Sequence, residues 1–301
     1  MKILCVGHLT FDTTVPVNEF PCENEKYHLD KKIDCGGGPA SNAGYLLKLW
    51  GEDVSVAGVV GDDFQGHFVK EEFDNIGVNT DYLEMVPNMK TDSSYIIANT
   101  NNGSRTILTF TGDRKSHPCS KVINDKYDCI VLDGEDAELG KKVIENNPEA
   151  IKILDAGNLR EGTVALSYLV DYLVCSHDYA EDYTNMKMDY SDINSIIKIY
   201  EKMKESYNNK IIITLESFGC FTEIDGKYEI VPSINVKPID STGAGDIFHG
   251  AFTYFLIHGY DMRSILKYSN ITGALSVEKI GSRNSMSKLE DVLRKGEIEI
   301  L

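Results

Sequence analysis

The sequence predicts an α/β fold in which a central, mostly parallel β-sheet is covered by helices on both faces. Short, continuously apolar runs recur along the chain, as is typical of strands that are buried on both faces. Stretches of helical length and spacing lie between these runs, and such alternation favours a parallel sheet. The length of 301 residues suits one large domain, which we expect to comprise residues 1–301.

The elements follow from these patterns in chain order. The strands are expected at Ile3–Val6, Val54–Val60, Cys129–Leu132, Ile151–Leu154, Tyr172–Cys175 and Ile211–Leu215. Helices are expected at Asn42–Trp50, Phe64–Ile76 and Ile193–Tyr207. Another helix is expected after residue 246, because apolar residues recur there at helical spacing and form two adjacent buried stripes.

Two segments interrupt this alternation and predict a second, smaller sheet. The first, Thr13–Cys35, is polar with modest alternation. In the second, Ser94–Thr100 and Arg105–Thr111 flank an Asn-Asn-Gly-Ser sequence whose Asn-Gly step favours a hairpin turn. We expect these segments to form a small antiparallel sheet over the crevice at the carboxyl ends of the parallel strands. We interpret residues 13–35 and 94–111 as a lid.

Composition excludes several classes of protein. The formal net charge of −17, without a Lys/Arg cluster, argues against a nucleic-acid partner. No apolar run approaches the ~18 residues of a membrane span. Asp12 follows Met1 too soon for a secretory signal, so a cytoplasmic location is expected. The seven cysteines include no C-x-x-C pair, and neither a disulfide framework nor a zinc site is expected.

The segment from Asp240 to His249, Asp-Ser-Thr-Gly-Ala-Gly-Asp-Ile-Phe-His, is the most informative in the chain. Gly243 and Gly245 allow a tight turn before a helix, where backbone N–H groups and the helix dipole favour an anion. Asp246 in the same turn is well placed to take a proton from a hydroxyl that approaches a phosphate. Ordinary helix capping by Ser, Thr and Asp is the alternative interpretation, but it would need only one such residue.

Further residues fit a site for a polyhydroxy ligand and its phosphorylation. Gly37 and Gly38 precede a helix and allow a ligand to approach the backbone, and Asn42 offers both a donor and an acceptor. Asp12, after the first strand, places a carboxylate where it can accept two sugar hydroxyls. Arg105 in the lid could reach a transferring phosphoryl group. A plain turn and solvated charged residues are the alternatives.

With these residues the chain resembles the PfkB, or ribokinase-like, family of carbohydrate kinases from about Ile3 to Val292. No Walker motif and no protein-kinase H-R-D or D-F-G element occurs, so other kinase classes do not fit. The resemblance implies a ribokinase-like fold, with Gly243, Ala244 and Gly245 as the anion hole and Asp246 as the catalytic base. It places Gly37, Gly38 and Asn42 in the family's N-terminal motif, and Asp12 where the family has a sugar-binding aspartate.

The same resemblance implies ATP and Mg²⁺ as cofactors. The nucleotide-binding positions carried over from the family are Thr214, Gly219, Thr242, Gly243, Gly245, Gly281 and Ser285. Asp240 is a candidate for a monovalent-cation site, with K⁺ as the candidate ion. A homodimer formed through the lid is the candidate assembly, with a small-molecule sugar and ATP as the other partners.

The chain departs from the family pattern at two places. Glu216 stands where the family usually has glycine, and a carboxylate near nucleotide phosphates would be repulsive. The family's N-x-x-E element is replaced by Ser176-His177-Asp178-Tyr179. The second departure also occurs in ketohexokinase-like members, which Ala40-Ser41-Asn42 and Arg105-Thr106-Ile107 resemble as well. Ketohexokinase itself has a substrate-binding Asn where this chain has Pro39, so fructose is only a candidate.

We therefore predict an ATP-dependent kinase that phosphorylates a hydroxyl of a small sugar, with a ketose as one candidate. A nucleoside kinase is the first alternative, although the lid segments are poor in aromatic residues that could stack on a base. A sensor that kept the pocket and lost catalysis is the second, suggested by Glu216 and the missing N-x-x-E. Retention of Asp246 argues against a sensor, which would have no use for a base.

Overall fold

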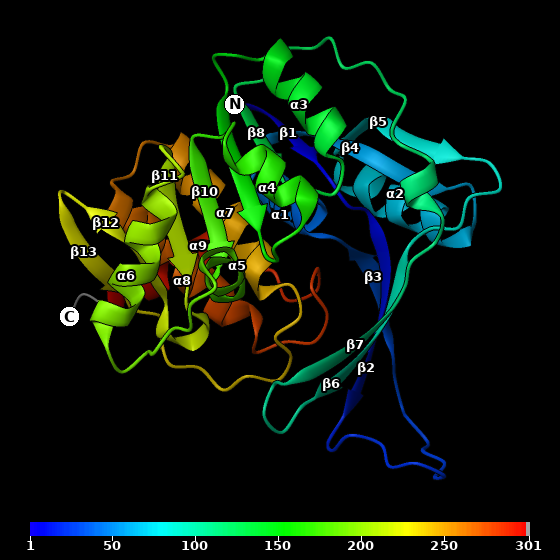
Figure 1. Cartoon of the computed structure of the whole chain (residues 1–301). Helices are drawn as coiled ribbons and strands as arrows, with labels where there is room; N and C mark the ends of the chain where they lie inside the picture. Colours follow the sequence, from blue (N-terminus) through cyan, green and yellow to red (C-terminus); the bar gives the residue numbers. More distant parts are fainter. Residues whose placement is uncertain (299–301) are drawn as a thin grey trace.

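The main body is built on one large sheet, seen in a computed structural model that describes residues 1–298 apart from the side chain of Lys115 (Figure 1). Within these residues nine strands pair in the order β13-β12-β11-β10-β9-β8-β1-β4-β5, and the seven from β11 to β5 are parallel. Their bounds are β1 Lys2–Val6, β4 Asp53–Gly61, β5 Asn79–Val86, β8 Cys129–Leu132, β9 Ile151–Ala156, β10 Tyr172–Ser176, β11 Lys210–Thr214, β12 Cys220–Ile224 and β13 Lys227–Val231. The predicted α/β class is confirmed.

Helices cover both faces of this sheet, as its buried apolar runs require (Figure 1). One face packs against α1 Pro39–Leu49, α2 Phe64–Ile76, α7 Ala244–Ile257, α8 Met262–Ser276 and α9 Leu289–Ile298. The other packs against α3 Ala137–Asn146, α4 Glu161–Ser167, α5 His177–Thr184 and α6 Ile193–Lys204. The strand cysteines Cys5, Cys129 and Cys175 are buried in these two cores.

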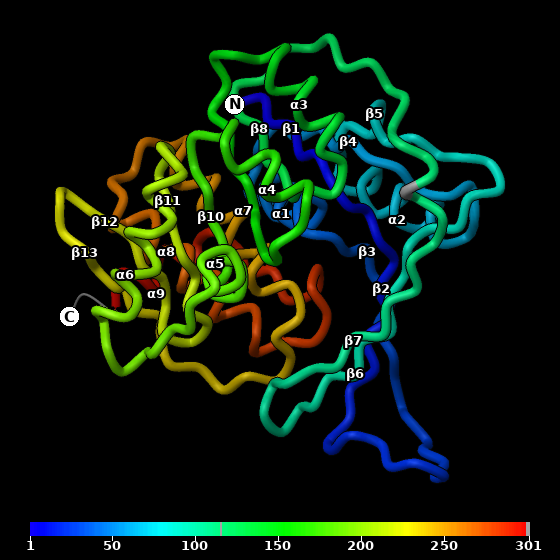
Figure 2. The backbone as a smooth tube through the Cα atoms, in the orientation of Figure 1, coloured from blue at the N-terminus to red at the C-terminus, as the bar shows by residue number. Residues whose placement is uncertain are grey.

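A second sheet projects from the body, as Figure 2 shows. Its strands pair in the order β3-β2-β6-β7, with bounds β2 Thr10–Val17, β3 Ile33–Gly37, β6 Ser93–Asn99 and β7 Arg105–Phe110. The expected wholly antiparallel sheet was wrong in one pairing, because β2 and β6 run parallel. These strands leave the body at different points of the chain, with β3, α1, β4, α2 and β5 between them, and such a long connection permits parallel pairing.

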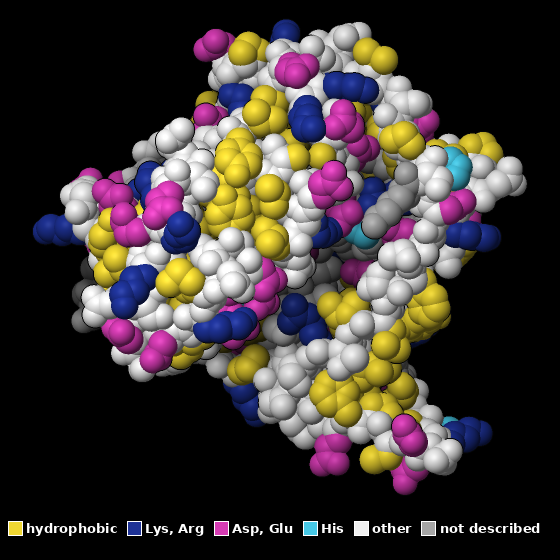
Figure 3. Space-filling view, viewed as in Figure 1, with side chains coloured by type: hydrophobic (Ala, Val, Ile, Leu, Met, Phe, Trp, Pro, Cys, Tyr) yellow, Lys and Arg dark blue, Asp and Glu magenta, His cyan; other side chains and the backbone are white. Residues whose placement is uncertain are grey.

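The carboxyl ends of the parallel strands and the small sheet face the same region of the molecule. The surface is hollowed between the body and the small sheet, and side chains of both charges line the hollow (Figure 3). Parallel α/β sheets bind their ligands at this edge. No helix within residues 1–298 is both long and apolar enough to cross a membrane.

Candidate active site

The turn before α7 is shaped to hold an anion. Gly243 begins the helix with a φ of 74°, and a Cβ there would lie 2.6 Å from Cβ of Ser282, so only glycine fits. No side-chain oxygen caps α7, which removes the alternative of ordinary capping. The first backbone N–H groups of a helix have no intrahelical acceptor. Gly245 is exposed, with no atom within 4 Å of where its Cβ would be, so the space above this turn is open.

Asp240 fastens this turn to the loop after α8. The side chain is 1% exposed, and its Oδ1 accepts hydrogen bonds from the backbone N (2.9 Å) and Oγ1 (2.6 Å) of Thr242. Its Oδ2 accepts from the backbone N of Gly281 at 2.8 Å. Both oxygens are therefore used within the chain to shape the turn. A monovalent cation beside Asp240 stays a prediction.

Asp246 lies in the first turn of α7 and faces Asn42 of α1. Its Oδ2 accepts a hydrogen bond from Nδ2 of Asn42 at 2.7 Å. The Oδ1 of Asn42 is buried without a hydrogen-bond partner, which leaves an acceptor for a ligand hydroxyl. Burial raises the pKa of Asp246, against the opposing effects of the Asn42 hydrogen bond and the nearby His249 and Arg105. A desolvated carboxylate of this kind is a stronger base than a solvated one.

Asp12 occupies the floor of the same region. It was expected at the end of the first strand and lies instead within β2, where it is opposite Cys35 of β3. The side chain is 8% exposed, and its Oδ1 accepts from Oγ1 of Thr10 at 3.1 Å. Burial is the main cause that raises the pKa of Asp12 to about 6, and the charge of Asp246 adds to it. The two carboxylates are therefore near enough for their charges to interact.

The glycines at 37 and 38 are needed for packing as well as for ligand access. A Cβ on Gly37 would lie 2.0 Å from Oδ2 of Asp12. Gly38 has a φ of 98°, and a Cβ there would lie 2.0 Å from the carbonyl oxygen of His8. The glycine-rich loop therefore packs directly against the connection between β1 and β2. This close approach brings the chain just before α1 next to Asp12.

Arg105 connects the small sheet to the anion turn. It is exposed at the start of β7, and its Nη1 donates to Oγ of Ser241 at 2.5 Å. The Ser241 hydroxyl in turn donates to the carbonyl oxygen of Gly103 at 3.0 Å. The hairpin between β6 and β7 thus reaches the residue two positions before Gly243. The guanidinium charge lowers the pKa of Asp246, so the two side chains act on one another.

The expected nucleotide-binding residues fall into two groups. Gly281 is joined to the turn through Asp240, and Ser285 is buried in the same loop, where its Oγ donates to the carbonyl oxygen of Ser282 at 2.7 Å. Thr214 and Gly219 lie at the carboxyl end of β11. Within residues 1–298 no hydrogen bond links these two to the turn. A nucleotide that bound both groups would extend along this edge of the sheet.

The structure explains both departures from the family pattern. Glu216 has a φ of 52°, a conformation that glycine adopts without strain, and its side chain is exposed. Tyr179 takes the place of the N-x-x-E carboxylate and is fully buried, with its hydroxyl bonded to those of Ser167 (2.8 Å) and Tyr207 (3.0 Å). That position therefore contributes no charge to the site. Ser176 caps α5 through a hydrogen bond from the N of Tyr179.

No protein cage for a metal ion is present in the described part of the chain, where three or more His, Cys, Asp or Glu side chains do not converge at any point. Mg²⁺ usually keeps several waters and binds to substrate phosphates through one or two carboxylates at most. The turn before α7, here called the anion turn, is therefore compatible with an Mg²⁺ ion that binds together with a nucleotide.

Sequence reasoning missed residues that shape the site through contacts distant in the chain. Asp133, directly after β8, is fully buried and accepts hydrogen bonds from the backbone N of His8 (2.8 Å), Ala40 (3.2 Å) and Glu135 (3.0 Å). It ties the glycine-rich loop to the ends of β1 and β8. A lone Asp that ends the apolar run before Gly134 was the only available signal.

Arg283 is the second missed residue. Its Nη1 pairs with Oε2 of Glu72 at 2.6 Å, and its Nη2 donates to Oγ of Ser41 at 2.8 Å. The guanidinium also lies over the rings of Tyr45 (4.6 Å) and Phe73 (4.5 Å). These contacts fix the loop of Gly281 and Ser285 against α1 and α2.

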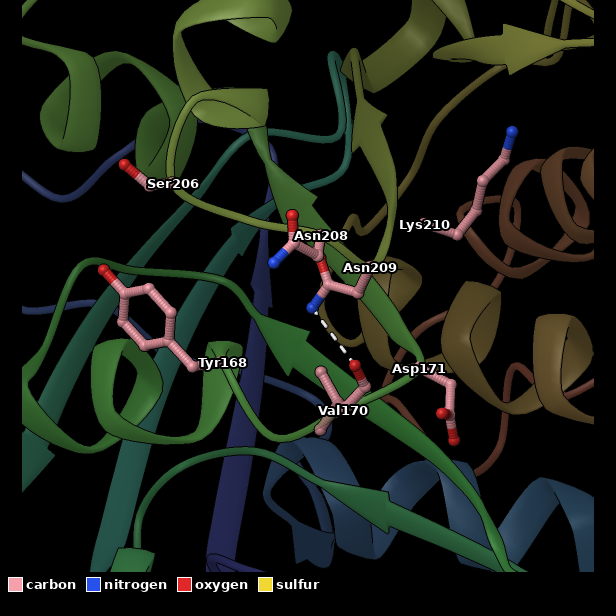
Figure 4. Close-up of a pocket in the computed structure, with 7 residues that line it drawn as sticks. All are labelled: Tyr168, Val170, Asp171, Ser206, Asn208, Asn209 and Lys210. Carbon is pink, nitrogen blue, oxygen red and sulfur yellow. Dashed lines mark hydrogen bonds between the residues drawn. The ribbon is translucent and has the colours of Figure 1, made fainter.

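A separate pocket opens at the amino ends of β10 and β11, on the edge opposite to the anion turn. Figure 4 shows its lining residues, Tyr168, Val170, Asp171, Ser206, Asn208, Asn209 and Lys210. Nδ2 of Asn209 donates to the carbonyl oxygen of Val170 at 3.2 Å and helps to shape the wall. This pocket contains none of the predicted site residues.

Comparison with known proteins identifies the family of this chain. A model of the pfkB family of carbohydrate kinases matches residues 1–289. The chain belongs to this family. It is therefore a phosphotransferase with an alcohol group as acceptor.

Individual relatives match this pfkB family member along nearly the whole chain. The deoxyribokinase of Salmonella typhi is 28% identical over 307 residues, 96% of this chain and 97% of the relative. The ribokinase of Bacillus subtilis is 25% identical over 97% of this chain and 98% of the relative. The structure of Arabidopsis thaliana ribokinase complexed with ribose and ATP has a TM-score of 0.80 at 22% identity, over 98% of both chains. These relatives support a ribokinase-like kinase and do not single out the ketohexokinase-like branch.

Proposed function

We propose that the protein transfers the γ-phosphoryl group of ATP to a hydroxyl of a small, uncharged sugar. The observation that carries this proposal is the position of Asp246, a desolvated carboxylate in the first turn of α7 beside backbone N–H groups without side-chain partners. This arrangement supports the roles of Asp246 as proton acceptor and of the neighbouring N–H groups as a cradle for a phosphate. Asn42 and Asp12 supply hydroxyl-binding groups within the same site.

The reaction follows from these placements. Asp12 and the free Oδ1 of Asn42 accept hydrogen bonds from sugar hydroxyls and orient the acceptor. Asp246 takes the proton of the attacking hydroxyl as its oxygen bonds to the γ-phosphorus, and the bond from that phosphorus to the bridging oxygen of ADP breaks. The N–H groups that follow Gly243 stabilise the charge on the transferring group, and Arg105 assists from the small sheet.

The charge of the site favours an uncharged acceptor over a sugar phosphate. Asp12 and Asp246 both face the site, and burial raises the pKa of each. The nearby guanidinium of Arg283 is already paired with Glu72. A second anion on the sugar would add repulsion without a free partner to offset it. Arg105 lies on the phosphate side of the site, next to Ser241.

Two observations bear on the identity of the sugar. The named relatives are ribokinases and a deoxyribokinase, which supports a pentose. The Ser176–Tyr179 segment and Arg105-Thr106-Ile107 resemble ketohexokinase-like members, which supports a ketose such as fructose. We propose that both classes outpace any nucleoside. Tyr95 and Phe110 of the small sheet pack edge to face with each other, 6.0 Å between centroids, which supports a role in packing instead of base stacking.

ATP and Mg²⁺ belong to this proposal as the phosphoryl donor and its counter-ion. Thr214, Gly219, Gly281 and Ser285 would contact the nucleotide, and Thr242 to Gly245 would surround its phosphates. K⁺ beside Asp240 is proposed as an activator. It is tested by the ratio of turnover in K⁺ to turnover in an equal concentration of choline, which should exceed one.

The small sheet also suits self-association. β7 is exposed along its whole length, and it presents Ile107, Leu108 and Phe110, with Tyr95 beside them on β6. Figure 3 shows hydrophobic side chains gathered over this sheet. An edge strand with exposed apolar side chains readily pairs with another chain. We propose a homodimer through this surface, and light scattering should show a dimer that Leu108→Lys weakens.

A coupled assay of ADP release tests the proposed activity. Purified protein is assayed with ATP and Mg²⁺ against ribose, deoxyribose, fructose, other hexoses and nucleosides. We expect sugar-dependent turnover, with a pentose or ketose giving the highest kcat/KM. Faster turnover of a purine nucleoside would favour the nucleoside-kinase alternative. Binding of a sugar without turnover would favour the sensor.

A further inference from the structure

His249 lies one turn after Asp246 on α7, beneath the proposed catalytic carboxylate. It is only 4% exposed. Its ring bridges two neighbouring strands of the large sheet, because Asp155 of β9 and Val174 of β10 are paired in register. His249 and Asp246 are three positions apart on α7, so both side chains lie on the same face of the helix.

Each ring nitrogen of His249 faces a backbone carbonyl oxygen, which can only accept a hydrogen bond. Nδ1 is 2.7 Å from the carbonyl oxygen of Gly245 and 3.1 Å from Oδ2 of Asp155. Nε2 is 3.1 Å from the carbonyl oxygen of Val174. A neutral imidazole has one N–H and one lone pair, so either tautomer would point a lone pair at a carbonyl oxygen. Only the doubly protonated ring satisfies every contact, with the Asp155 carboxylate as its counter-ion.

We propose that His249 is an imidazolium that keeps Asp246 ionised and fixes the Gly245 carbonyl of the anion turn. It is a positioning residue, since it acts on the reaction through Asp246 and Gly245 without contact with the substrate. The kinetic part of this proposal rests on the proposed function, in which Asp246 is the base. The protonation state of His249 does not depend on it.

The charges around His249 explain why a cation is needed there. Asp155 faces it from β9, Asp246 lies on its own helix, and Asp133 lies at the end of β8. The positive charge of Arg105 on β7 also lowers the pKa of Asp246. Burial raises the pKa of Asp155 to about 7 in spite of the His249 charge, and the charges of Asp246 and Asp133 contribute to that rise. Carboxylates whose charges act on one another in a desolvated region ionise together only with a compensating charge.

The sign of the kinetic effect follows from these charges. Asp246 must be ionised to accept a proton, so kcat/KM falls on the acid side as Asp246 becomes protonated. A cation lowers the pKa of Asp246, and its loss raises that pKa. His249→Asn removes the cation and keeps a polar side chain. We expect the acid limb of kcat/KM to move up by about one pH unit, so that the loss is largest at low pH.

Asp155 provides the matched variants. Asp155→Asn removes an anion, and we expect the acid limb to stay in place or to move to lower pH. The double variant His249→Asn with Asp155→Asn replaces a neutral ion pair by two neutral side chains. We expect its limb to return to within about 0.3 pH unit of the wild type. A purely structural role would instead lower kcat/KM equally at every pH in all three variants, and that result would overturn the proposal.

Nitrogen NMR tests the protonation state without any activity. The protein is labelled with ¹⁵N-histidine, and the His249 signals are assigned from the His249→Gln variant, or from their slow exchange with solvent if that variant does not fold. We expect both ring nitrogens to be protonated at pH 7.5. A neutral tautomer would refute the proposal even if the enzyme proves to be a sugar kinase. If no sugar is turned over, a doubly protonated His249 would still stand.

Discussion

Replacement of Asp246 by Asn removes the proton acceptor and leaves the shape of the site almost unchanged. In the protein, Oδ2 of Asp246 accepts from Nδ2 of Asn42 at 2.7 Å. The amide oxygen of an Asn at this position can accept the same hydrogen bond. The amide cannot take the proton of the attacking hydroxyl, so the change acts on the chemical step and not on sugar binding.

The size of the effect follows from the loss of general-base catalysis. That contribution is typically about 10²–10⁴-fold, equivalent to about 3–5 kcal/mol in the activation barrier. We therefore expect kcat to fall by about 10²–10⁴-fold, with the KM for the sugar changed by less than about threefold. Burial raises the pKa of Asp246, so the ionised group destabilises the folded state at pH 7.5. The Asn variant should unfold at the same or a higher temperature than the wild type.

The assay is steady-state ADP release at pH 7.5 with sugar and ATP varied separately. Asp192→Asn is the matched control, because Asp192 caps α6 through a hydrogen bond to the N of Asn194 and Asn caps equally well. It should leave kcat and KM unchanged. A fully folded Asp246→Asn enzyme with kcat within threefold of the wild type would remove Asp246 from the mechanism.

Three further predictions concern the residues around the anion turn. Arg105→Ala should lower kcat by about tenfold and spare the KM for the sugar, because the guanidinium meets charge on the phosphoryl group; an effect on sugar KM alone in separate titrations contradicts this. Gly245→Ala should lower ATP turnover and keep the melting temperature of the wild type, since the added Cβ points into open space and meets no other atom. Gly243→Ala should lower both ATP turnover and the melting temperature, because its Cβ would collide with Ser282. Equal melting curves for the two variants would refute this distinction. Glu216→Gly should stabilise the fold by about 0.5–1 kcal/mol and lower the KM for ATP. Asp225→Gly is the control, because Asp225 also has a positive φ, of 51°, and this change should leave the KM for ATP as in the wild type. Identical ATP kinetics in the two variants would show that the charge of Glu216 does not affect ATP binding.

The elements with local signals could be predicted from the sequence. The α2 helix has the expected bounds because Asp63 caps its start, accepting from the N of Gly66, and Gly77 ends it with a φ of 75°. The buried strand β8 also has the expected bounds, since its four residues are all apolar. The bounds of these elements are determined by a few neighbouring residues, so helix caps and local hydrophobic pattern are enough to predict them.

Elements that depend on distant partners could not be predicted. β12 and β13 form an antiparallel hairpin at the edge of the sheet, and their polar residues on the exposed face hid the strand pattern. The parallel pairing of β2 with β6 depends on how the small sheet leaves the body. That path cannot be predicted from the sequence of any one segment.

The same limit applies to the candidate site. The anion turn and Asp246 were readable, because glycines before an apolar helix carry the signal in ten residues. The burial of Asp133, the stacking of Arg283 on two rings and the contact of His249 with Asp155 join residues far apart in the chain. Only the fold shows which of the many charged residues meet in this way.

Phosphorus NMR of the reaction with each sugar tests the central claim, that the protein is a sugar kinase, most directly. Purified protein is incubated with ATP, Mg²⁺ and each of ribose, deoxyribose and fructose, and the ³¹P signals of ATP, ADP and any new phosphate ester are followed with time. We expect a sugar phosphate to appear in equal amount to ADP with at least one sugar, and no product without sugar or with Asp246→Asn over the same period. ATP that stays intact with every sugar, or that yields only inorganic phosphate, would contradict the assignment of a sugar kinase.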